Sequence, residues 1–424
     1  MKCLKHIILH LEVCILSSYK DLYMDKSNPD ACGIIPSANI FWKKDLRIIQ
    51  FVHVFLSKKS ESRFAIIAAY VDDLNLVRAP EELTKTANWL KNEFEMKDLG
   101  KTKFCLGLQI ERLLNGILVH QSTYTKKVLK QFYMDKAHPL STPVVGRSLD
   151  VKKDPFWPQE DDEETLGLEI PYLSAIGALM YLANYTRPDI AFAVNLLARY
   201  SFAPTRRHWN GIKHILRYLR GTTDLGLFYP NGSKSQLIGY VDASYLSDPH
   251  KGWSQTGYLF TYGNTAISWR SVKQTISATS SNHAEIIAIH EASCECVWLR
   301  SVIQHIRENC GLSSIINSPT ILYKDNVACI TQIRGDYIKG DRNKHIAPKF
   351  FYTHELQKSG DIDFKQIWSR DNLADMFTMS LPIANFRTKL PFAHFGQINQ
   401  PCALLSKQNR EMPFFWKSSF SKSS

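Results

Sequence analysis

The stretch that decides the fold reads QLIGYVDASY at residues 236–245 and continues with TGYLFTYGNTAISWR at residues 256–270. Both segments carry the β-branched and aromatic residues that favour strands. Gly263 and Asn264 interrupt the second segment, and this dipeptide is typical of a tight turn between two strands. Three antiparallel strands are therefore expected over residues 236–270.

A long helix and two further strands follow this unit. NHAEIIAIHEASCECVWLRSVIQHI (282–306) predicts the helix. TILYKDN (320–326) and DIDFKQIWS (361–369) predict strands with a helix between them, and DNLADMFT (371–378) predicts the beginning of a last helix. The order β-β-β-α-β-α-β-α implies one mixed sheet, with antiparallel strands first and parallel crossovers after.

Four acidic residues lie at the boundaries of these expected elements. Asp242 is expected to end the first strand and Glu285 to begin the long helix, while Asp325 follows the fourth strand and Asp375 begins the last helix. Strand ends and helix starts can meet in one crevice of such a sheet. Each acid also has an ordinary structural interpretation, as a turn residue, an N-cap or, for Glu285 with Asn282, a capping box.

Converging carboxylates would suit the hydrolysis of a phosphodiester by two metal ions. That reaction needs an activated water and a stabilised leaving oxygen, and two Mg²⁺ ions about 3.5–4 Å apart supply both. Mg²⁺ prefers carboxylate oxygens, and the bound cations remove the repulsion between the acids. This chemistry is one hypothesis for the four residues.

A second acidic pair lies upstream, in FAIIAAYVDDLNLV at residues 64–77. Apolar, strand-forming residues flank Asp72 and Asp73, which predicts a strand–turn–strand with both carboxylates at the bend. A divalent cation would remove their mutual repulsion, whereas a surface β-turn is the alternative. Further along, Asn115-Gly116 predicts a second hairpin.

A basic helix is predicted over HWNGIKHILRYLRG, residues 208–221. Its apolar residues Ile212, Ile215, Leu216 and Leu219 share one stripe, and its basic residues lie off that stripe. This face is either a solvated side of an ordinary amphipathic helix or a surface that contacts phosphates. The residues assigned to nucleic-acid binding are Arg206, Arg207, Lys213, Arg217, Arg220 and Lys273.

Composition is consistent with a polyanionic partner and a reducing compartment. The chain has 424 residues, enough for two or three domains, and a formal net charge of +12. Its nine cysteines contain no C-x-x-C pair, which indicates free thiols. Histidines and Glu12 interrupt the apolar N-terminal run, so we expect no signal peptide. An intracellular location, cytoplasmic or nuclear, is expected, with no membrane span.

Several long motifs resemble the Pol polyproteins of copia-type LTR retrotransposons. YVDDLNLV followed by EFEMKDLGKTKFCLGLQIE is similar to part of their reverse transcriptase. The stretch from YLSAIGALMYLANYTRPDI to ILRYLRGT is similar to the segment that joins polymerase to ribonuclease H. GYVDASYLSDPHKGWSQTGYLF, ISWRSVKQTISATSSNHAEIIAI, LYKDN and NLADMFT resemble the ribonuclease H domain. The resemblance covers residues 62–382.

The resemblance implies a fold of the α+β or α/β class. A truncated reverse transcriptase palm and thumb would precede a connecting helical region and a ribonuclease H-like mixed sheet with flanking helices. It implies Mg²⁺, with Mn²⁺ as the alternative, and an RNA/DNA hybrid or other nucleic acid as the partner; it leaves the oligomeric state open. The residues that it makes catalytic and metal-binding are Asp72, Asp73, Asp242, Glu285, Asp325 and Asp375.

The chain also departs from the family pattern. Residues 1–71 contain no motif like the family's further metal-binding aspartate or its fingers region, so we expect a truncated fragment without RNA-directed DNA polymerase activity. Lys324 stands where the family has a neutral or acidic residue, and it either competes with metal or points to solvent. Ala347 replaces an aspartate and Met379 a lysine.

Two functions follow from this pattern. Either Mg²⁺-dependent cleavage of RNA in RNA/DNA hybrids is retained, or the chain is a catalytically inactive retroelement remnant that only binds nucleic acid. The expected domains are a divergent segment (1–61), a partial palm and thumb (62–145), a linker (146–170), connecting helices (171–235), a ribonuclease H-like domain (236–390) and a tail (391–424).

Overall fold

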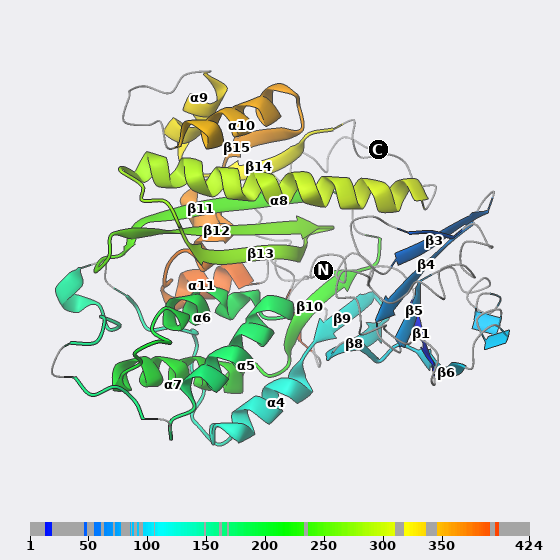
Figure 1. Cartoon of the computed structure of the whole chain (residues 1–424), viewed down its shortest axis with the longest axis horizontal. Coiled ribbons are helices and arrows are strands. Elements are labelled where there is room, and N and C mark those ends of the chain that lie inside the picture. Colours follow the sequence, from blue (N-terminus) through cyan, green and yellow to red (C-terminus); the bar gives the residue numbers. More distant parts are fainter. Residues whose placement is uncertain are drawn as a thin grey trace, which may run out of the picture.

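The computed structural model describes most of the chain from residue 96 onward and isolated strands before it (Figure 1). The described residues are 13–18, 46–48, 55–60, 63–70, 73–77, 85, 87–88, 91–92, 96–105, 107–147, 150–160, 163–167, 169–232, 236–309, 318–335, 346–390 and 395–397. For residues 13–18, 46–48, 55–60, 63–70, 73–77, 96–99, 151, 309 and 395–397, the description covers the backbone alone.

The strands of the described residues form three sheets. The first has the order β2-β3-β4-β5-β1-β6, with β1 Val13–Ser18, β2 Leu46–Ile48, β3 Phe55–Ser60, β4 Arg63–Tyr70, β5 Asp73–Val77 and β6 Met96–Lys101. The second has the order β16-β10-β9-β8-β7, with β7 Phe104–Cys105, β8 Leu108–Leu113, β9 Gly116–His120, β10 Leu225–Pro230 and β16 Phe395–Gln397.

The third sheet has the order β13-β12-β11-β14-β15. Its strands are β11 Leu237–Asp248, β12 Trp253–Tyr262, β13 Thr265–Lys273, β14 Thr320–Lys324 and β15 Ile362–Gln366. The first three pair antiparallel, and β14 and β15 join in parallel. The mixed sheet predicted from the element order is therefore confirmed, and with it the α/β class of the fold.

Helices pack on both sides of this third sheet. They are α4 Ser122–Gln131, α5 Tyr172–Tyr185, α6 Ala191–Ala198, α7 Arg206–Gly221, α8 Ser281–Asn309, α9 Val327–Arg334, α10 Ala347–Lys358 and α11 Ile383–Lys389, with short 3₁₀ turns η1 Val151–Lys153, η2 Pro188–Ile190, η4 Ser369–Asp371 and η5 Leu373–Phe377. The long helix α8 lies along β11 and β12, and α6 contacts β13 on the side where α5 and α7 gather (Figure 1).

Local sequence signals account for most of these elements. Gly263 and Asn264 both have positive φ, 59° and 67°, and Tyr262 pairs with Thr265 across them, which confirms the predicted two-residue turn. The hairpin predicted at Asn115-Gly116 is also confirmed. Its two-residue loop consists of residues 114 and 115, one residue earlier than predicted, because Leu113 pairs directly with Gly116.

The apolar stripe of α7 is buried as predicted. Ile212, Ile215, Leu216 and Leu219 are at most 1% exposed, and burial of each such side chain stabilises the fold by about 1.5–3 kcal/mol. They belong to one continuous core, which also includes residues of β11, β12, α8 and β14. The connecting helices therefore share a core with the third sheet.

Two predicted elements differ in the structure. DNLADMFT forms the 3₁₀ turns η4 and η5 rather than an α-helix, and the following helix α11 begins only at Ile383. Within the predicted linker, Asp154 and Phe156 are buried, and Arg147 donates hydrogen bonds to both carboxylate oxygens of Asp154, at 2.9 and 2.7 Å. The predicted domain boundaries themselves stay predictions.

Candidate functional site

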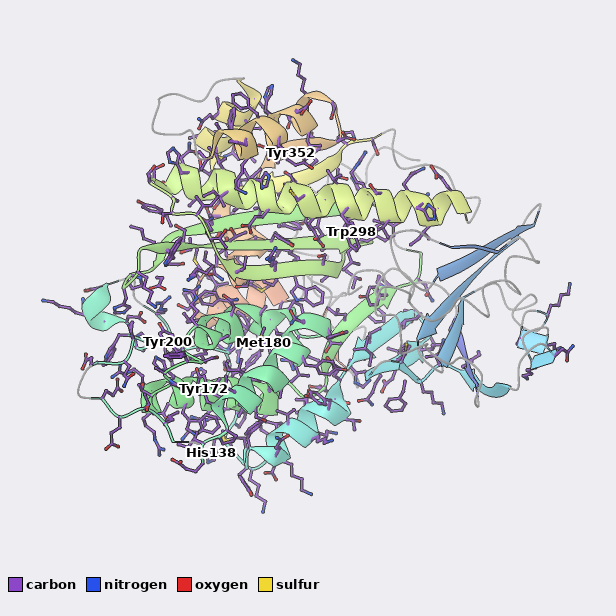
Figure 2. All side chains as sticks on the ribbon, in the orientation of Figure 1. His138, Tyr172, Met180, Tyr200, Trp298 and Tyr352 are labelled. Atoms are coloured by element: carbon purple, nitrogen blue, oxygen red, sulfur yellow. The ribbon has the colours of Figure 1, made fainter. Side chains whose placement is uncertain are left out.

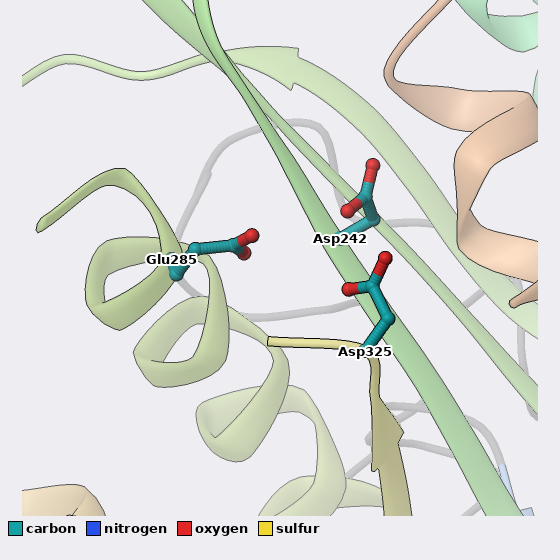
Figure 3. A group of neighbouring side chains, drawn as sticks. All are labelled: Asp242, Glu285 and Asp325. Atoms are coloured by element: carbon teal, nitrogen blue, oxygen red, sulfur yellow. The ribbon is translucent and has the colours of Figure 1, made fainter. Parts of the chain in front are cut away.

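Three of the four predicted acids meet beside the neighbouring strands β11 and β14 of the third sheet. Asp242 comes from β11, Asp325 follows β14, and Glu285 lies near the beginning of α8; all three carboxylates point toward one another (Figure 3). One oxygen atom of each lies within 4.8 Å of the others. We call these three residues the carboxylate cluster. The convergence that the sequence predicted is confirmed for them.

Strand register explains why the two aspartates are neighbours. Tyr240 of β11 pairs with Tyr323 of β14 in the parallel ladder, and their rings stack with centroids 5.4 Å apart. Asp242 and Asp325 each come two residues later. Side chains two residues apart share a face of a strand, so this register brings both carboxylates to the same place.

The predicted position of Asp242 at the end of its strand was wrong. The strand β11 continues to Asp248, because β12 pairs with it through Ser244 and again at Asp248. The alternative interpretation of Glu285, as the partner of Asn282 in a capping box, does not hold in the structure. Ser280 instead accepts a hydrogen bond from the backbone N–H of His283, at 3.2 Å. Glu285 is therefore free of the helix terminus and reaches the cluster.

The ammonium group of Lys324 lies in the middle of the carboxylate cluster. Its Nζ is 3.0 Å from Asp242 Oδ1, 2.9 Å from Glu285 Oε2 and 2.6 Å from Asp325 Oδ1. The side chain of Lys324 is 0% exposed. Of the two orientations open from the sequence, the structure has the one that directs this lysine into the acids.

Burial and charge shift the pKa values of the cluster in different directions. Burial, with the charges of Asp242 and Asp325, raises the pKa of Glu285 to about 8, although Lys324 acts in the opposite sense. Burial opposes the charge of Lys324, yet the three carboxylates together raise its pKa. For Asp325, the neighbouring Lys324 outweighs burial and lowers the pKa. The lysine therefore remains charged, and its charge favours the carboxylate form of Asp325.

Asp375, the fourth predicted acid, has a lysine of its own. Its Oδ2 lies 2.9 Å from Nζ of Lys389, and Lys389 also donates hydrogen bonds to the carbonyl oxygens of Ser369, at 3.1 Å, and Asn372. Burial and the charge of Asp242 raise the pKa of Asp375 to about 7, against the effect of Lys389. Asp375 lies outside the group of three acids whose oxygen atoms are within 4.8 Å of one another, although the charges of Asp242 and Asp325 both act on it.

The segment that carries Asp375 also holds the cluster in position. Thr378 donates a hydrogen bond from its hydroxyl group to Asp242 Oδ2, and Ser369 donates one to Asp325 Oδ2, at 2.7 Å. Asn372 fixes the segment to β11 through a 3.0 Å hydrogen bond to the carbonyl oxygen of Val241. The sequence offered no local signal for these contacts, because each joins residues far apart in the chain.

The carboxylate cluster has the ligands of a divalent-cation site, but its centre is occupied by Lys324. Three carboxylates are the oxygen ligands that Mg²⁺ and Mn²⁺ prefer, and the acids alone would suit such an ion. The centre between them is held by the Lys324 ammonium, which already contacts all three at 3.0 Å or less. A divalent cation does not fit in the same place beside a buried positive charge.

The upstream aspartate pair lies largely outside the described residues. The strands β4 and β5 pair antiparallel, with Tyr70 opposite Asp73, so the predicted strand–turn–strand is confirmed for the backbone. Asp72 falls between the described strands, and Asp73 is described by its backbone alone. Their predicted metal-binding role stays a prediction.

Three of the predicted phosphate-contacting residues bind other parts of this chain. Arg217 and Arg220 donate hydrogen bonds to the carbonyl oxygens of His138, at 2.8 Å, and Asp135, at 2.6 Å. Arg207 pairs with Glu163 at 2.6 Å and lies 3.7 Å over the ring of Trp157. These arginines fasten α7 to the preceding segments, and their role in nucleic-acid binding stays a prediction.

The other three predicted basic residues lie on α7 and β13. Arg206 is exposed and Lys213 is half-buried on α7. Lys273, at the end of β13, has its Nζ 5.0 Å from the ring of Trp253.

No described helix has both the length and the apolar character needed to cross a bilayer. The side chains spread over the described part of the chain are drawn in Figure 2, where Trp298 of α8 and Tyr352 of α10 are labelled.

Comparison with known proteins gives consistent matches. Residues 38–146 match the family described as "Reverse transcriptase (RNA-dependent DNA polymerase)". The retrovirus-related Pol polyprotein from transposon TNT 1-94 of Nicotiana tabacum is 36% identical over 78% of this chain and 24% of its own length. The putative transposon Ty5-1 protein YCL074W of Saccharomyces cerevisiae is 32% identical over 54% of this chain and 73% of its own length.

The chain spans about a quarter of the length of the first curated relatives that it matches. Among solved structures, LC11-RNase H1 in complex with an RNA/DNA hybrid is similar over 34% of this chain and 94% of that protein, with 17% identity and a TM-score of 0.25.

Proposed function

Because this chain belongs to the family of retrovirus-related Pol polyproteins from copia-type transposons, we propose that it binds RNA/DNA hybrids and does not cleave them. The observation that carries this proposal is the Lys324 ammonium held among Asp242, Glu285 and Asp325 at 2.6–3.0 Å. Cleavage by this kind of site depends on divalent cations. In this arrangement, the carboxylates are already bound to a cation that activates no water.

The lysines that neutralise the acids of this site support the binding of nucleic acid beside the carboxylate cluster. Three carboxylates without a counter-charge would repel a phosphate backbone. Lys324 neutralises part of that charge, and Lys389 does the same for Asp375. With a net charge of +12 over the whole chain, the protein attracts polyanions. A hybrid of A-like geometry would be recognised through phosphates and 2′-hydroxyl groups, without reading base sequence.

We propose no DNA polymerase step for this chain. The side chains of Asp72 and Asp73 lie outside the described part of the chain, so no geometry supports one. An RNA/DNA hybrid ligand would place the protein in the cytoplasm or the nucleus.

Metal-dependent cleavage is the second candidate function. The observation in its favour is that the acids have their oxygen atoms within 4.8 Å of one another. It would require Mg²⁺ or Mn²⁺ to displace Lys324. The geometry favours binding alone, because this lysine is completely buried and cannot turn its charge to solvent without a rearrangement of its surroundings.

A fluorescent RNA/DNA hybrid tests both functions in one preparation. The purified chain and its Asp242→Asn variant would be incubated with the hybrid in Mg²⁺ or Mn²⁺. Anisotropy would report binding, and gel electrophoresis would report cleavage. We expect binding by both proteins, weakened steeply by salt, and RNA that stays intact. Cleavage by the natural chain that is lost in Asp242→Asn would establish the nuclease instead, and absence of binding would refute the proposal.

A further inference from the structure

We infer that Lys324 replaces the divalent cation of this site, as a tethered ammonium ion that holds the carboxylate cluster together and excludes metal. The inference rests on the proposed function, since it says what cation the hybrid-binding site of this chain contains. It assigns to Lys324 the neutralising role for which the acids alone would require a bound ion.

The stoichiometry of the contacts is the first argument. An ammonium group has three N–H donors. Nζ of Lys324 donates hydrogen bonds to Asp242 Oδ1 and Asp325 Oδ1, at 3.0 and 2.6 Å, and forms an ion pair with Glu285 Oε2 at 2.9 Å. Those acids come from three separate elements of the fold. A single charge thus joins β11, α8 and the end of β14, as a bound ion would.

The confinement of Lys324 is the second argument. Its side chain is completely buried at the end of β14, in the same sheet position that places Asp325 beside Asp242. A lysine on a surface would leave its partners whenever a stronger cation arrived. Here the ammonium group is buried, and a divalent ion at the same centre would meet its positive charge at close range in a site of low dielectric constant.

The carboxylates have supports that do not involve Lys324. The second oxygen of Asp242 accepts the hydroxyl of Thr378, and the second oxygen of Asp325 accepts the hydroxyl of Ser369, at 2.7 Å. Both aspartates should therefore keep their positions when the lysine is shortened.

Two substitutions separate the charge of Lys324 from its volume. Lys324→Ala removes both, and leaves space among three acids. Lys324→Met removes the charge and fills most of the same space. Each protein, and the natural chain, would be titrated with Mn²⁺ and Mg²⁺ in a calorimeter and unfolded by heat with each metal or with a chelator.

The natural chain should take up neither metal at millimolar concentration and should unfold at the same temperature with metal or chelator. Lys324→Ala should unfold at a lower temperature in chelator, recover in Mn²⁺, and bind Mn²⁺ at least tenfold more tightly than the natural chain does. Lys324→Met should unfold at a similarly lowered temperature in chelator, and Mn²⁺ should not restore that temperature. Adding Asp242→Asn to Lys324→Ala should abolish the gain in metal binding.

Uptake of Mn²⁺ by the natural chain that raises its unfolding temperature above the value in chelator would overturn the inference, and this measurement does not depend on whether the variants fold. Equal stability of Lys324→Ala and the natural chain in chelator would also overturn it. Hybrid binding is scored separately: if the metal results hold but no hybrid binds, the proposed function fails while the assignment of Lys324 stands.

Discussion

Gly257 of β12 lies directly opposite Asp242 of β11 in the antiparallel ladder, and its missing side chain is what lets η5 approach the sheet. A Cβ atom at this position would meet Thr378 Cγ2 at 2.6 Å and Phe377 Cβ at 2.8 Å. Thr378 is the residue whose hydroxyl group binds Asp242. A glycine in one strand thus supports the position of an acid in the next.

We therefore expect Gly257→Ala to destabilise the protein by about 1–3 kcal/mol, the usual cost of an overpacked core. Urea unfolding measures it. Gly177→Ala is the matched control, because a Cβ atom there, in α5, meets nothing within 4 Å; alanine should stabilise that helix by about 0.5–1 kcal/mol. Equal effects at the two sites would contradict the close approach of η5.

A buried ion pair at η2, which follows α5, gives a second prediction. Arg187 and Asp189 are each 1% exposed, their closest contact is 2.7 Å, and Tyr218 donates a further 2.7 Å hydrogen bond to Asp189. Arg187→Met leaves a buried carboxylate without its partner, so we expect a loss of about 3–5 kcal/mol in the free energy of unfolding.

The control for this substitution is an exposed pair. Arg370 lies 3.6 Å from Asp371 and has a side chain that is 80% exposed. Arg370→Met should change the free energy of unfolding by less than about 1 kcal/mol. Comparable losses for Arg187→Met and Arg370→Met would mean that the buried pair does not stabilise this part of the core.

Stability should fall in mild acid because of His208. Burial lowers the pKa of His208 from 6.5 to about 4, with Arg207 acting in the same sense and the carbonyl of Trp157, Glu163 and Asp154 acting against it. The neutral ring caps α7, since its Nδ1 accepts the backbone N–H of Thr205 at 3.0 Å. A protonated Nδ1 cannot accept that hydrogen bond.

The direction of this pH effect depends on whether His208 binds a proton in the folded and in the unfolded chain. Between pH 6.5 and about 4, the unfolded chain carries a proton on this histidine and the folded chain does not, so unfolding becomes easier as the pH falls. The full stability is present above pH 6.5, and the loss reaches roughly 3 kcal/mol at most. His208→Gln keeps a capping side chain and should flatten the difference between pH 7 and pH 4.5. An unchanged slope would exclude this histidine as the cause.

The basic residues of α7 should divide into two groups. Arg206 is exposed, whereas Arg217 binds the carbonyl oxygen of His138 at 2.8 Å. We expect Arg206→Ala to weaken hybrid binding and to reduce the slope of log affinity against log salt by about 1, with no change in melting temperature. Arg217→Ala should instead lower the melting temperature. A salt slope unchanged by Arg206→Ala would remove this residue from the phosphate contacts.

The sequence by itself determined the elements whose stability is local. The turn at Gly263 and Asn264 needs two residues that tolerate positive φ, and the apolar stripe of α7 needs only the helical period, so neither depends on distant contacts. The order of the motifs also indicated the family, and the resemblance predicted Asp242, Glu285 and Asp325 as site residues. Spacing along the chain is sufficient for such features.

Only the tertiary structure decided what the acids hold. Lys324 adjoins Asp325 in the sequence, yet its direction depends on β11 and α8, which bring two further carboxylates to its ammonium group. The 3₁₀ form of η5 and the contacts of Thr378 depend in the same way on the close approach to Gly257. The physical reason is that burial raises the strength of charge interactions, and burial is a property of the packed chain rather than of any short segment.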